Sequence, residues 1–370
     1  MDGQRRAPRV LHVSQPVEAG VARVVAGLVR DQSARGWDVL VACPDRGWLA
    51  ETVRESGARL LPWTASRSPG PSVPGETLAL RRLVARADPQ VLHLHSAKAG
   101  LTGRLAVRGS RPTVFQPHAW SFEAVTGRVQ TATRLWERTA QRWTDLTINV
   151  SEAERATGAA SGITGRAVVI PNGIDPQAWA PRDRAAARSA LGMTATRAPT
   201  VVCVGRLARQ KGQDLLLEAW PAVRRAVPDA RLALVGGGPD EAELRAQADG
   251  SVSFVPGERL AEWYAAADVV AVPSRWEAGL PLVAMEAMAS ERSVVAFDVA
   301  GIGTYLGGSG TAVPPFDVAG LARELTARLL DPTLAAHEAA TGRTVASTRF
   351  AAATSHETTA TALLNLMEPG

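Results

Sequence analysis

Cysteine is scarce in this chain, and no long apolar segment is present. Only two cysteines occur among 370 residues, Cys43 and Cys203, and each falls inside an apolar run typical of a strand. So few thiols exclude a disulfide scaffold and are typical of the reducing cytoplasm. No segment approaches the roughly 20 apolar residues that span a bilayer, and the apolar run near the start is too short for a signal peptide. The sequence therefore predicts a soluble, cytoplasmic protein.

Signatures of several nucleotide-binding and nucleic-acid-binding classes are also missing. A dinucleotide site needs G-x-G-x-x-G between a strand and a helix. Only Gly20 follows the first apolar strand, and the glycine run at 236–238 lacks the third spaced glycine. A P-loop lysine motif and the interleaved basic and aromatic residues of a nucleic-acid binder are absent too. These absences argue against an NAD enzyme, a P-loop NTPase and a nucleic-acid-binding protein.

Lysine is almost absent, although basic residues are plentiful. Of 41 basic residues only Lys98 and Lys211 are lysines, which suggests that a compact ammonium is needed at these two positions. The first 180 residues carry 23 basic and 15 acidic side chains, and the remainder carry 18 and 21. A basic first half favours an anionic partner, such as a membrane surface or a phosphorylated acceptor. The alternative is that scattered arginines only keep the protein soluble.

Apolar strands alternate with helical patterns along both halves of the chain, and 370 residues exceed what one core usually covers. The strands are expected at 9–16, 37–44, 91–95, 112–118, 200–207, 231–239, 252–257, 268–274 and 293–299. This alternation predicts two α/β domains with parallel, doubly wound sheets, at 1–178 and 185–349. The Pro-, Arg- and Ala-rich stretch 176–199 is interpreted as the linker. A ligand is expected in a cleft between the strand ends.

Charged and titratable side chains gather at several of these strand ends. Two carboxylates, Glu277 and Glu286, flank the apolar run GLPLVAM, where an unpartnered charge would be costly. Arg206 and Lys211 stand between a strand and a helix, which is a suitable place for a diphosphate. His93 and His95 alternate on one strand, but no third ligand follows at a spacing typical of a metal site. The favoured interpretation is that His95 and Lys98 line the acceptor side of the cleft.

Seven motifs occur in the order found in retaining glycosyltransferases of family 4, and the chain resembles that family over nearly its whole length. The motifs are AGVAR (19–23), PHAW (117–120), PNGID (171–175), VGRLARQKG (204–212), VGGGPDEAEL (235–244), SRWEAGLPLVAMEAMA (274–289) and the VPP of GTAVPPFD (310–317). The resemblance implies the GT-B fold, in which two Rossmann-like domains face each other. It also implies that a last helix, 350–370, returns to the first domain.

The resemblance assigns most donor-binding roles to the second half. Glu286 is expected to bind the ribose of a nucleotide-sugar, and Arg206 and Lys211 to hold its diphosphate. Gly205 belongs to the same strand-to-helix motif. Backbone N–H groups of Gly279, Leu280 and Leu282 are expected to face the donor sugar and phosphate.

Three further roles are implied by the resemblance. Gly20 is expected to lie against the diphosphate or the acceptor, and His118 to approach the transferred sugar. Glu277 is expected to contact the sugar's hydroxyl groups. Eight residues separate Glu277 from Glu286, whereas the family usually has seven, so either the loop bulges or Ala278 takes the aligned place. A second departure is AGIGTYL (300–306), where the family often has an acidic residue after its Gly-Ile pair.

The predicted reaction is transfer of a sugar from a nucleoside diphosphate, with UDP preferred over GDP, to an acceptor hydroxyl with retention of configuration. No metal or other cofactor is expected, because the two cations replace one. The favoured acceptor is lipid-linked, in cell-envelope or exopolysaccharide synthesis, with the protein peripheral at the inner face of the plasma membrane. Six arginines in or beside helical stretches are expected to form the basic face that binds it: Arg81, Arg82, Arg86, Arg104, Arg108 and Arg111. The alternatives are a soluble small-molecule acceptor, a nucleotide-sugar epimerase of the same fold and a non-catalytic sugar-nucleotide binder.

Overall fold

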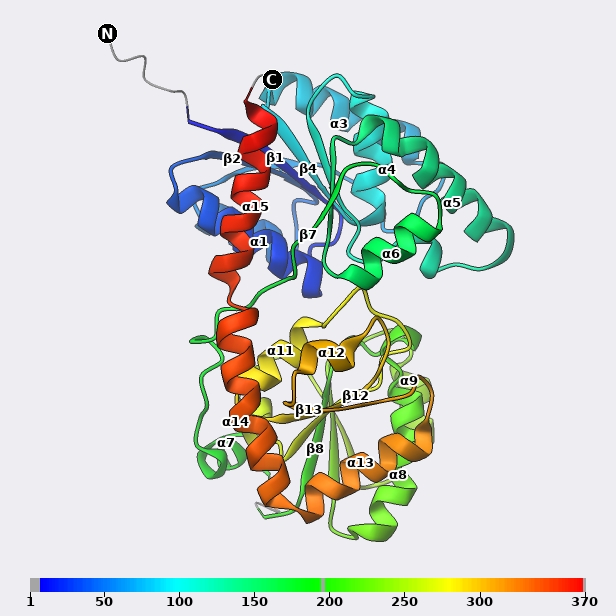
Figure 1. Ribbon diagram of the computed structural model, residues 1–370, viewed down its shortest axis with the longest axis vertical. Helices are drawn as coiled ribbons and strands as arrows, with labels where there is room; N and C mark the ends of the chain where they lie inside the picture. The colour runs from blue at the N-terminus through cyan, green and yellow to red at the C-terminus, as the bar shows by residue number, and fades with distance from the viewer. Residues whose placement is uncertain (1–6, 194–196, 369–370) are drawn as a thin grey trace. The chain divides into compact units, whose positions relative to one another are not determined.

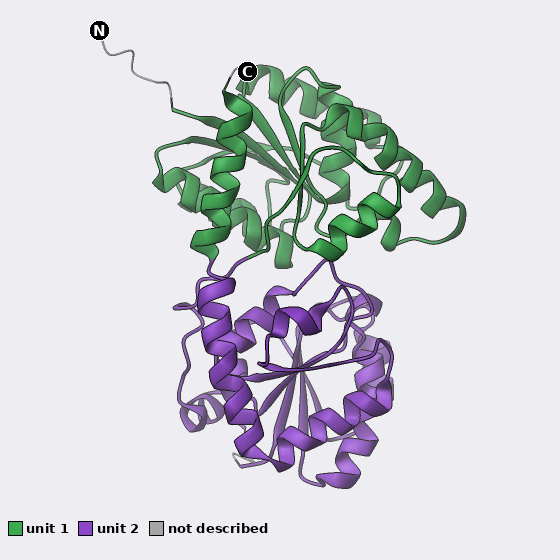
Figure 2. Cartoon of the chain, in the orientation of Figure 1, with its two compact units in different colours: residues 1–172, 352–370 green, residues 173–351 purple. Residues whose placement is uncertain are grey.

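The computed structural model describes residues 7–193 and 197–368. The chain divides into two compact units (Figure 2): unit 1 comprises Met1–Asn172 and Ala352–Gly370, and unit 2 comprises Gly173–Ala351. Each unit is built on its own parallel sheet with helices on both faces (Figure 1). The predicted pair of doubly wound α/β domains is confirmed.

The sheet of unit 1 has the strand order β3-β2-β1-β4-β5-β6-β7. Its strands are β1 (Arg9–Ser14), β2 (Asp38–Cys43), β3 (Arg59–Pro62), β4 (Val91–His95), β5 (Thr113–Gln116), β6 (Leu146–Asn149) and β7 (Ala167–Val169). The chain winds outward from β1 in one direction and from β4 in the other. The switch point between β1 and β4, where such sheets bind ligands, therefore lies at the carboxyl ends of these two strands.

The helices of unit 1 bury the two faces of this sheet separately. They are α1 (Ala19–Ala34), α2 (Trp48–Glu55), α3 (Val73–Ala87), α4 (Ser96–Val107), α5 (Gly127–Ala140), α6 (Glu152–Ala160) and α15 (Ala352–Met367), with 3₁₀ turns η1 (Ser121–Glu123) and η2 (Gln141–Trp143). Val10 of β1 packs with α1, α2 and Leu363 of α15, whereas Leu11 packs with α3 and α4. Because successive strand side chains point to opposite faces, His12 shares the α1 face with Val10.

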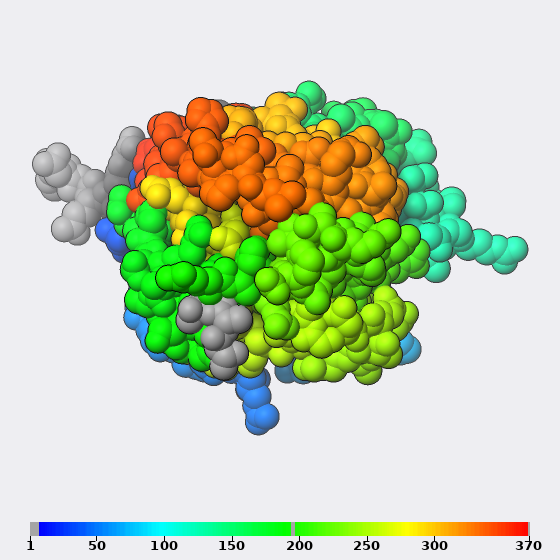
Figure 3. Space-filling view, turned by 90° about the horizontal axis from the view of Figure 1, so that it is seen from below, coloured from blue at the N-terminus to red at the C-terminus, as the bar shows by residue number. Residues whose placement is uncertain are grey.

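The sheet of unit 2 repeats the plan with the order β10-β9-β8-β11-β12-β13. The strands are β8 (Thr200–Val204), β9 (Arg231–Val235), β10 (Val252–Val255), β11 (Val269–Val272), β12 (Ser293–Phe297) and β13 (Gly310–Val313). The helices are α7 (Arg184–Ala190), α8 (Gln213–Ala226), α9 (Glu241–Gln247), α10 (Leu260–Ala266), α11 (Leu282–Ala289), α12 (Ile302–Leu306), α13 (Val318–Leu330) and α14 (Pro332–Arg349), with the 3₁₀ turn η3 (Arg209–Lys211). Figure 3 shows α8 (lime) and the α13–α14 region (orange) side by side. The switch point of this sheet lies between β8 and β11.

The stretch 176–199 is not an interdomain linker, as its composition had suggested. The chain passes into unit 2 at Asn172–Gly173 and returns at Ala351–Ala352. Helix α7 packs on α10, and the Arg188 guanidinium donates to the carbonyl oxygen of Ala266 at 2.9 Å and to the carboxylate of Asp268 at 2.8 Å. These contacts make the stretch part of unit 2. Its residues 194–196 lie outside the described part of the chain.

No helix within residues 7–193 and 197–368 is both long and apolar enough to span a membrane.

Candidate active site

The loop that leaves β8 carries the predicted diphosphate-binding residues to the switch point of unit 2. Arg206 and Lys211 lie between β8 and α8, and both are partly exposed. The loop ends at Gly212, whose φ is +67°, and a Cβ there would lie 1.9 Å from the carbonyl oxygen of Pro273. Only glycine allows the β8 loop to approach the end of β11 this closely. The glycine at position 212 therefore allows Lys211 to lie beside the loop that contains Glu277.

Lys211 and Glu277 form an ion pair at this point. The Lys211 ammonium donates to Oε1 of Glu277, and the hydroxyl of Ser274 donates to the same oxygen at 2.7 Å. The two charged side chains are 24% and 10% exposed, so the pair is mostly shielded from water. Glu277 is thus directed at the predicted diphosphate lysine.

A second ion pair fixes the two loops to one another. The Arg275 guanidinium donates to both carboxylate oxygens of Asp214, at 2.6 and 2.5 Å. The backbone N–H of Arg275 also donates to the carbonyl oxygen of Gln210 at 2.8 Å. A bidentate arginine–carboxylate pair restricts orientation as well as distance. Asp214 and Arg275 were not among the predicted site residues, although the charges stand in the motifs VGRLARQKGQD and SRWE.

The glycines of the motif VGGGP permit a third close approach. A Cβ at Gly236 would lie 2.3 Å from the carbonyl oxygen of Gly205, and one at Gly238 would lie 2.1 Å from that of Leu207. The loop after β9 therefore lies directly against the loop that carries Arg206. The Arg206 carbonyl oxygen accepts a hydrogen bond from Nε2 of Gln213 at 3.1 Å. These backbone contacts hold the predicted diphosphate loop from two sides.

Glu286 is buried in α11, where its exposed fraction is 1%. The hydroxyl of Tyr264 donates to Oε2 of Glu286 at 2.8 Å. The N-cap residue of α11 is Pro281, and no side chain caps the helix. The first N–H groups of an uncapped helix are suited to binding an anion. Gly279, Leu280 and Leu282, predicted to face the donor, lie at this end of α11.

In unit 1, His118 lies in a turn with unusual backbone geometry just after β5. The φ angles of His118 and Ala119 are +54° and +87°, a region in which L-residues are rarely found. The turn is held by Glu154, whose Oε1 accepts from the Ala119 N–H at 2.7 Å and whose Oε2 accepts from the Val150 N–H at 2.7 Å. Burial raises the pKa of Glu154 to about 7. Sequence reasoning missed Glu154; the only signal for it was the helix-capping pattern S-x-x-E at 151–154.

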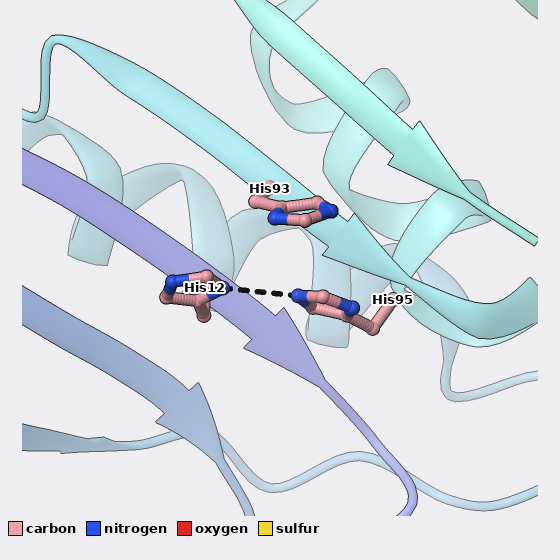
Figure 4. A group of neighbouring side chains, drawn as sticks. All are labelled: His12, His93 and His95. Carbon is pink, nitrogen blue, oxygen red and sulfur yellow. Dashed lines mark hydrogen bonds between the residues drawn. The ribbon is translucent and has the colours of Figure 1, made fainter. Parts of the chain in front are cut away.

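A cluster of histidines lies at the switch point of unit 1. His12 of β1 pairs in register with His93 of β4, and both share a face of the sheet with His95. Their ligand nitrogens lie within 4.8 Å of one another (Figure 4). No third ligand follows His93 and His95 at a typical spacing, as expected, but the structure brings His12 to them. The third histidine comes from an earlier strand, and assuming that β1 pairs with β4 would have found it.

Two basic residues of unit 1 are structural. Lys98 is 3% exposed, and its ammonium donates to the carboxylate of Glu76 at 2.8 Å. Arg104 is 1% exposed and donates to Glu137 at 2.7 Å. A buried, paired charge does not bind a ligand without leaving its partner unpaired. The acceptor role expected for Lys98 and the surface role expected for Arg104 are therefore corrected.

Two other predicted residues of unit 1 differ in exposure. His95 is fully buried, so it does not line an acceptor surface as expected. Gly20 is exposed in the first turn of α1, directly after Ala19, whose φ is +62°. No side chain caps α1. The phosphate or acceptor contact of Gly20 stays a prediction.

Family profiles match both halves of the chain. Residues 19–178 match the family profile described as "Glycosyltransferase Family 4", and residues 198–331 match "Glycosyl transferases group 1". The chain is 34% identical to the GDP-mannose-dependent alpha-(1-6)-phosphatidylinositol monomannoside mannosyltransferase of Mycolicibacterium smegmatis, over 73% of this chain and 76% of that protein. It is 32% identical to the phosphatidyl-myo-inositol mannosyltransferase of Mycobacterium leprae, over 88% of each chain.

A solved structure shows the same fold. The sucrose-phosphate synthase of Thermosynechococcus elongatus superposes with a TM-score of 0.83 at 24% identity, and the match covers 98% of this chain and 99% of that one. The predicted GT-B fold is thereby confirmed. With a family match in each half and a relative at 34% identity over three quarters of its length, the chain belongs to the family 4 glycosyltransferases.

Proposed function

We propose that this enzyme transfers mannose from GDP-mannose to an acceptor hydroxyl, with retention of the anomeric configuration. The observation that carries the proposal is the Lys211–Glu277 pair beside the uncapped start of α11, at the switch point of unit 2. The predicted preference for a UDP-sugar is not supported, because the mycobacterial relative above is named as GDP-mannose-dependent. GDP-mannose therefore replaces it in the proposal.

The proposed step separates charge at the diphosphate. The bond between the anomeric carbon and the diphosphate oxygen breaks, and the acceptor oxygen bonds to the same face of that carbon. The acceptor's proton passes to the departing phosphate oxygen. Arg206, Lys211 and the first N–H groups of α11 would stabilise the negative charge that develops on the leaving group, which is the largest effect such a site supplies.

The remaining contacts follow the family resemblance. Glu286 would accept hydrogen bonds from the ribose, and Glu277 from the sugar's hydroxyls once phosphate has replaced it at Lys211. His118 of unit 1 would contact the transferred sugar. No metal or other cofactor takes part in the proposed step, since Arg206 and Lys211 provide the positive charge. Unchanged turnover after dialysis against a chelator would support this, and loss of turnover restored by Mg²⁺ would contradict it.

Donor choice is tested by thermal shift with GDP-mannose, UDP-glucose and TDP-glucose. A ligand at 100 times its dissociation constant stabilises by about 2.7 kcal/mol, so the preferred donor should raise the unfolding temperature most. In a turnover assay Lys211→Ala should lower kcat/KM by about 30- to 1000-fold, equivalent to roughly 2–4 kcal/mol of lost leaving-group stabilisation. Lys211→Arg, which keeps the charge, serves as the control. Near-normal turnover of Lys211→Ala would remove Lys211 from the site.

The acceptor is proposed to be lipid-linked, as the names of the two mannosyltransferases suggest for those proteins. Arg81, Arg82 and Arg86 of α3 are exposed and supply a basic surface for an anionic membrane. Each cation near such a surface contributes about 1 kcal/mol. Replacing all three with alanine should reduce sedimentation with anionic vesicles at low salt. Replacing the exposed Arg225, Arg245 and Arg323 of unit 2 should not.

A soluble acceptor is the second candidate, because the basic face is smaller than expected. Arg104 is buried, and Arg111 donates to Asp88 at 2.5 Å. If the wild-type protein stays wholly in the supernatant with anionic vesicles, the lipid-linked acceptor should be replaced by a small soluble one.

A further inference from the structure

A series of hydrogen bonds runs from Gln32, in the last turn of α1, to His118. Nε2 of His12 lies 2.8 Å from Oε1 of Gln32, and Nδ1 of His12 lies 3.0 Å from Nε2 of His95 (Figure 4). Nδ1 of His95 then lies 3.2 Å from Nε2 of His118. Gln32, His12 and His95 are each fully buried. The three imidazoles are therefore linked in single file, with Gln32 at the inner end.

The three hydrogen-bonded histidines, His12, His95 and His118, are neutral near pH 7. Burial lowers the pKa of His12 to about 4 and the pKa of His95 well below 6.5. Burial also lowers the pKa of His118. A neutral imidazole has one N–H donor and one acceptor nitrogen. The direction of one hydrogen bond in the chain therefore determines the direction of all the others.

Gln32 lies with its carbonyl oxygen toward His12, and its amide Nε2 is buried without a hydrogen-bond partner. With the amide in this orientation, Nε2 of His12 carries the proton and Nδ1 accepts from Nε2–H of His95. Nδ1 of His95 then accepts from Nε2–H of His118. It follows that His118 carries its proton on Nε2 and that its Nδ1 is an acceptor.

We propose that Gln32, His12 and His95 are positioning residues that hold His118 as the Nε2–H tautomer, with Nδ1 presented to a hydroxyl of the transferred sugar. The sugar contact rests on the proposed function. The tautomer of His118 does not, because it follows from contacts inside unit 1 alone. Fixing the tautomer of a site histidine through the partner of its other nitrogen is a common use of such contacts.

A metal ion bound by His12, His93 and His95 is the competing interpretation. In its favour, Nδ1 of His93 is buried without a hydrogen-bond partner. Against it, the nitrogens of His12 and His95 that would bind the ion are joined by the 3.0 Å hydrogen bond. The rings of His93 and His95 also lie against one another, with centroids 4.0 Å apart and planes tilted by 37°, whereas ligand nitrogens must point at a common centre. The geometry favours the series of hydrogen bonds from Gln32 to His118 over a metal site.

The test is the imidazole tautomer in the full-length protein. Long-range ¹H–¹⁵N spectra of protein labelled at its six histidines distinguish Nε2–H from Nδ1–H rings, and single His→Gln variants assign the signals. His12, His95 and His118 should all be Nε2–H. Gln32→Met removes the terminal acceptor and should turn His118 into a mixture of tautomers. His93→Gln is the matched control, because His93 lies in the cluster but bonds to Gln116 at 3.1 Å and not to the chain.

Kinetics provide the second measurement. With the donor found above, Gln32→Met should lower kcat by about 10- to 100-fold while KM for the donor changes little, by analogy with outer partners of ligating histidines. An Nδ1–H ring at His118 in the wild-type protein would overturn the proposal. So would an unchanged His118 signal in a folded Gln32→Met variant, or one equivalent of metal in the purified protein. If no donor is turned over, the proposed function fails. The tautomer measurement still tests whether Gln32, His12 and His95 position His118.

Discussion

At the residue scale, Glu277 forms an ion pair with the ammonium of Lys211, which is proposed to bind the donor's diphosphate. Replacing Glu277 with glutamine removes this competition, so GDP alone should bind about tenfold more tightly, or about 1.4 kcal/mol. GDP-mannose should gain less, because the variant also loses the carboxylate that contacts the sugar. Titration calorimetry with both ligands measures the difference.

Ser274→Ala is the control for this prediction, because it removes the other hydrogen bond to Glu277 and leaves the charge unchanged. Its affinity for GDP should stay near that of the wild type. Weaker GDP binding by Glu277→Gln would contradict the prediction. It would mean that the Glu277 carboxylate positions Lys211 for the diphosphate and does not compete with the diphosphate.

His12 makes the stability of unit 1 sensitive to acid. Its pKa is lowered from 6.5 to about 4 by burial, so between these values the unfolded chain binds a proton that the folded chain does not. The stability is complete above pH 6.5 and is lost as the pH falls toward 4. Each pH unit removes about 1.4 kcal/mol, to a total of about 3 kcal/mol. His93, His95 and His118, whose pKa values are also lowered by burial, add to this slope. Urea unfolding of the full chain at several pH values should therefore show at least this slope, and His12→Gln should reduce it without abolishing it; an equal slope in the variant would assign all of it to other groups.

At the scale of elements, the close approach of the β8 and β11 loops depends on Gly212. Gly212→Ala places a Cβ against the carbonyl oxygen of Pro273 and should destabilise unit 2 by about 3 kcal/mol or more. The shifted loop should also weaken donor binding, since Lys211 moves with it.

The control for Gly212 is Gly192→Ala in the same unit. Gly192 has a similar φ of +70°, but a Cβ there meets nothing within 4 Å. It should lose only the penalty of the left-handed backbone, about 1 kcal/mol. Equal losses in the two variants, measured by denaturant unfolding, would show that the contact with Pro273 is unimportant.

At the scale of the whole molecule, unit 1 is discontinuous in sequence and is completed by α15. Leu363 of α15 is fully buried in the core beside α1, whereas its neighbour Leu364 is 38% exposed. Leu363→Ala should destabilise unit 1 by about 2–5 kcal/mol, and Leu364→Ala should have little effect. Hydrogen exchange should show the loss in the strands of unit 1 and not in those of unit 2. Equal loss in both units would mean that they unfold together.

The fold class could be predicted from the amino-acid sequence alone, and so could the position of Arg206, Lys211 and Glu277 at the switch point of unit 2. Alternating strands and helices require parallel sheets covered on both faces, and this pattern is local, so it is visible in short windows. Arg206, Lys211 and Glu277 stand in loops directly after strands, where a parallel sheet brings them to one edge. These predictions were possible because each depends only on residues close together in the sequence.

The tertiary structure alone decided which charges are paired and which histidines meet. Lys98 was predicted to line the site from its place after a strand. Its pairing was missed because its partner Glu76 lies 22 positions earlier and nothing local links them. Arg104 is likewise buried against Glu137, 33 residues away. His12 joins His95 only because β1 and β4 are neighbours in the sheet, although 83 positions separate the two histidines. Contacts of this kind depend on which strands become adjacent and which helix covers them, and periodicity and motif spacing report only on what lies nearby in the chain.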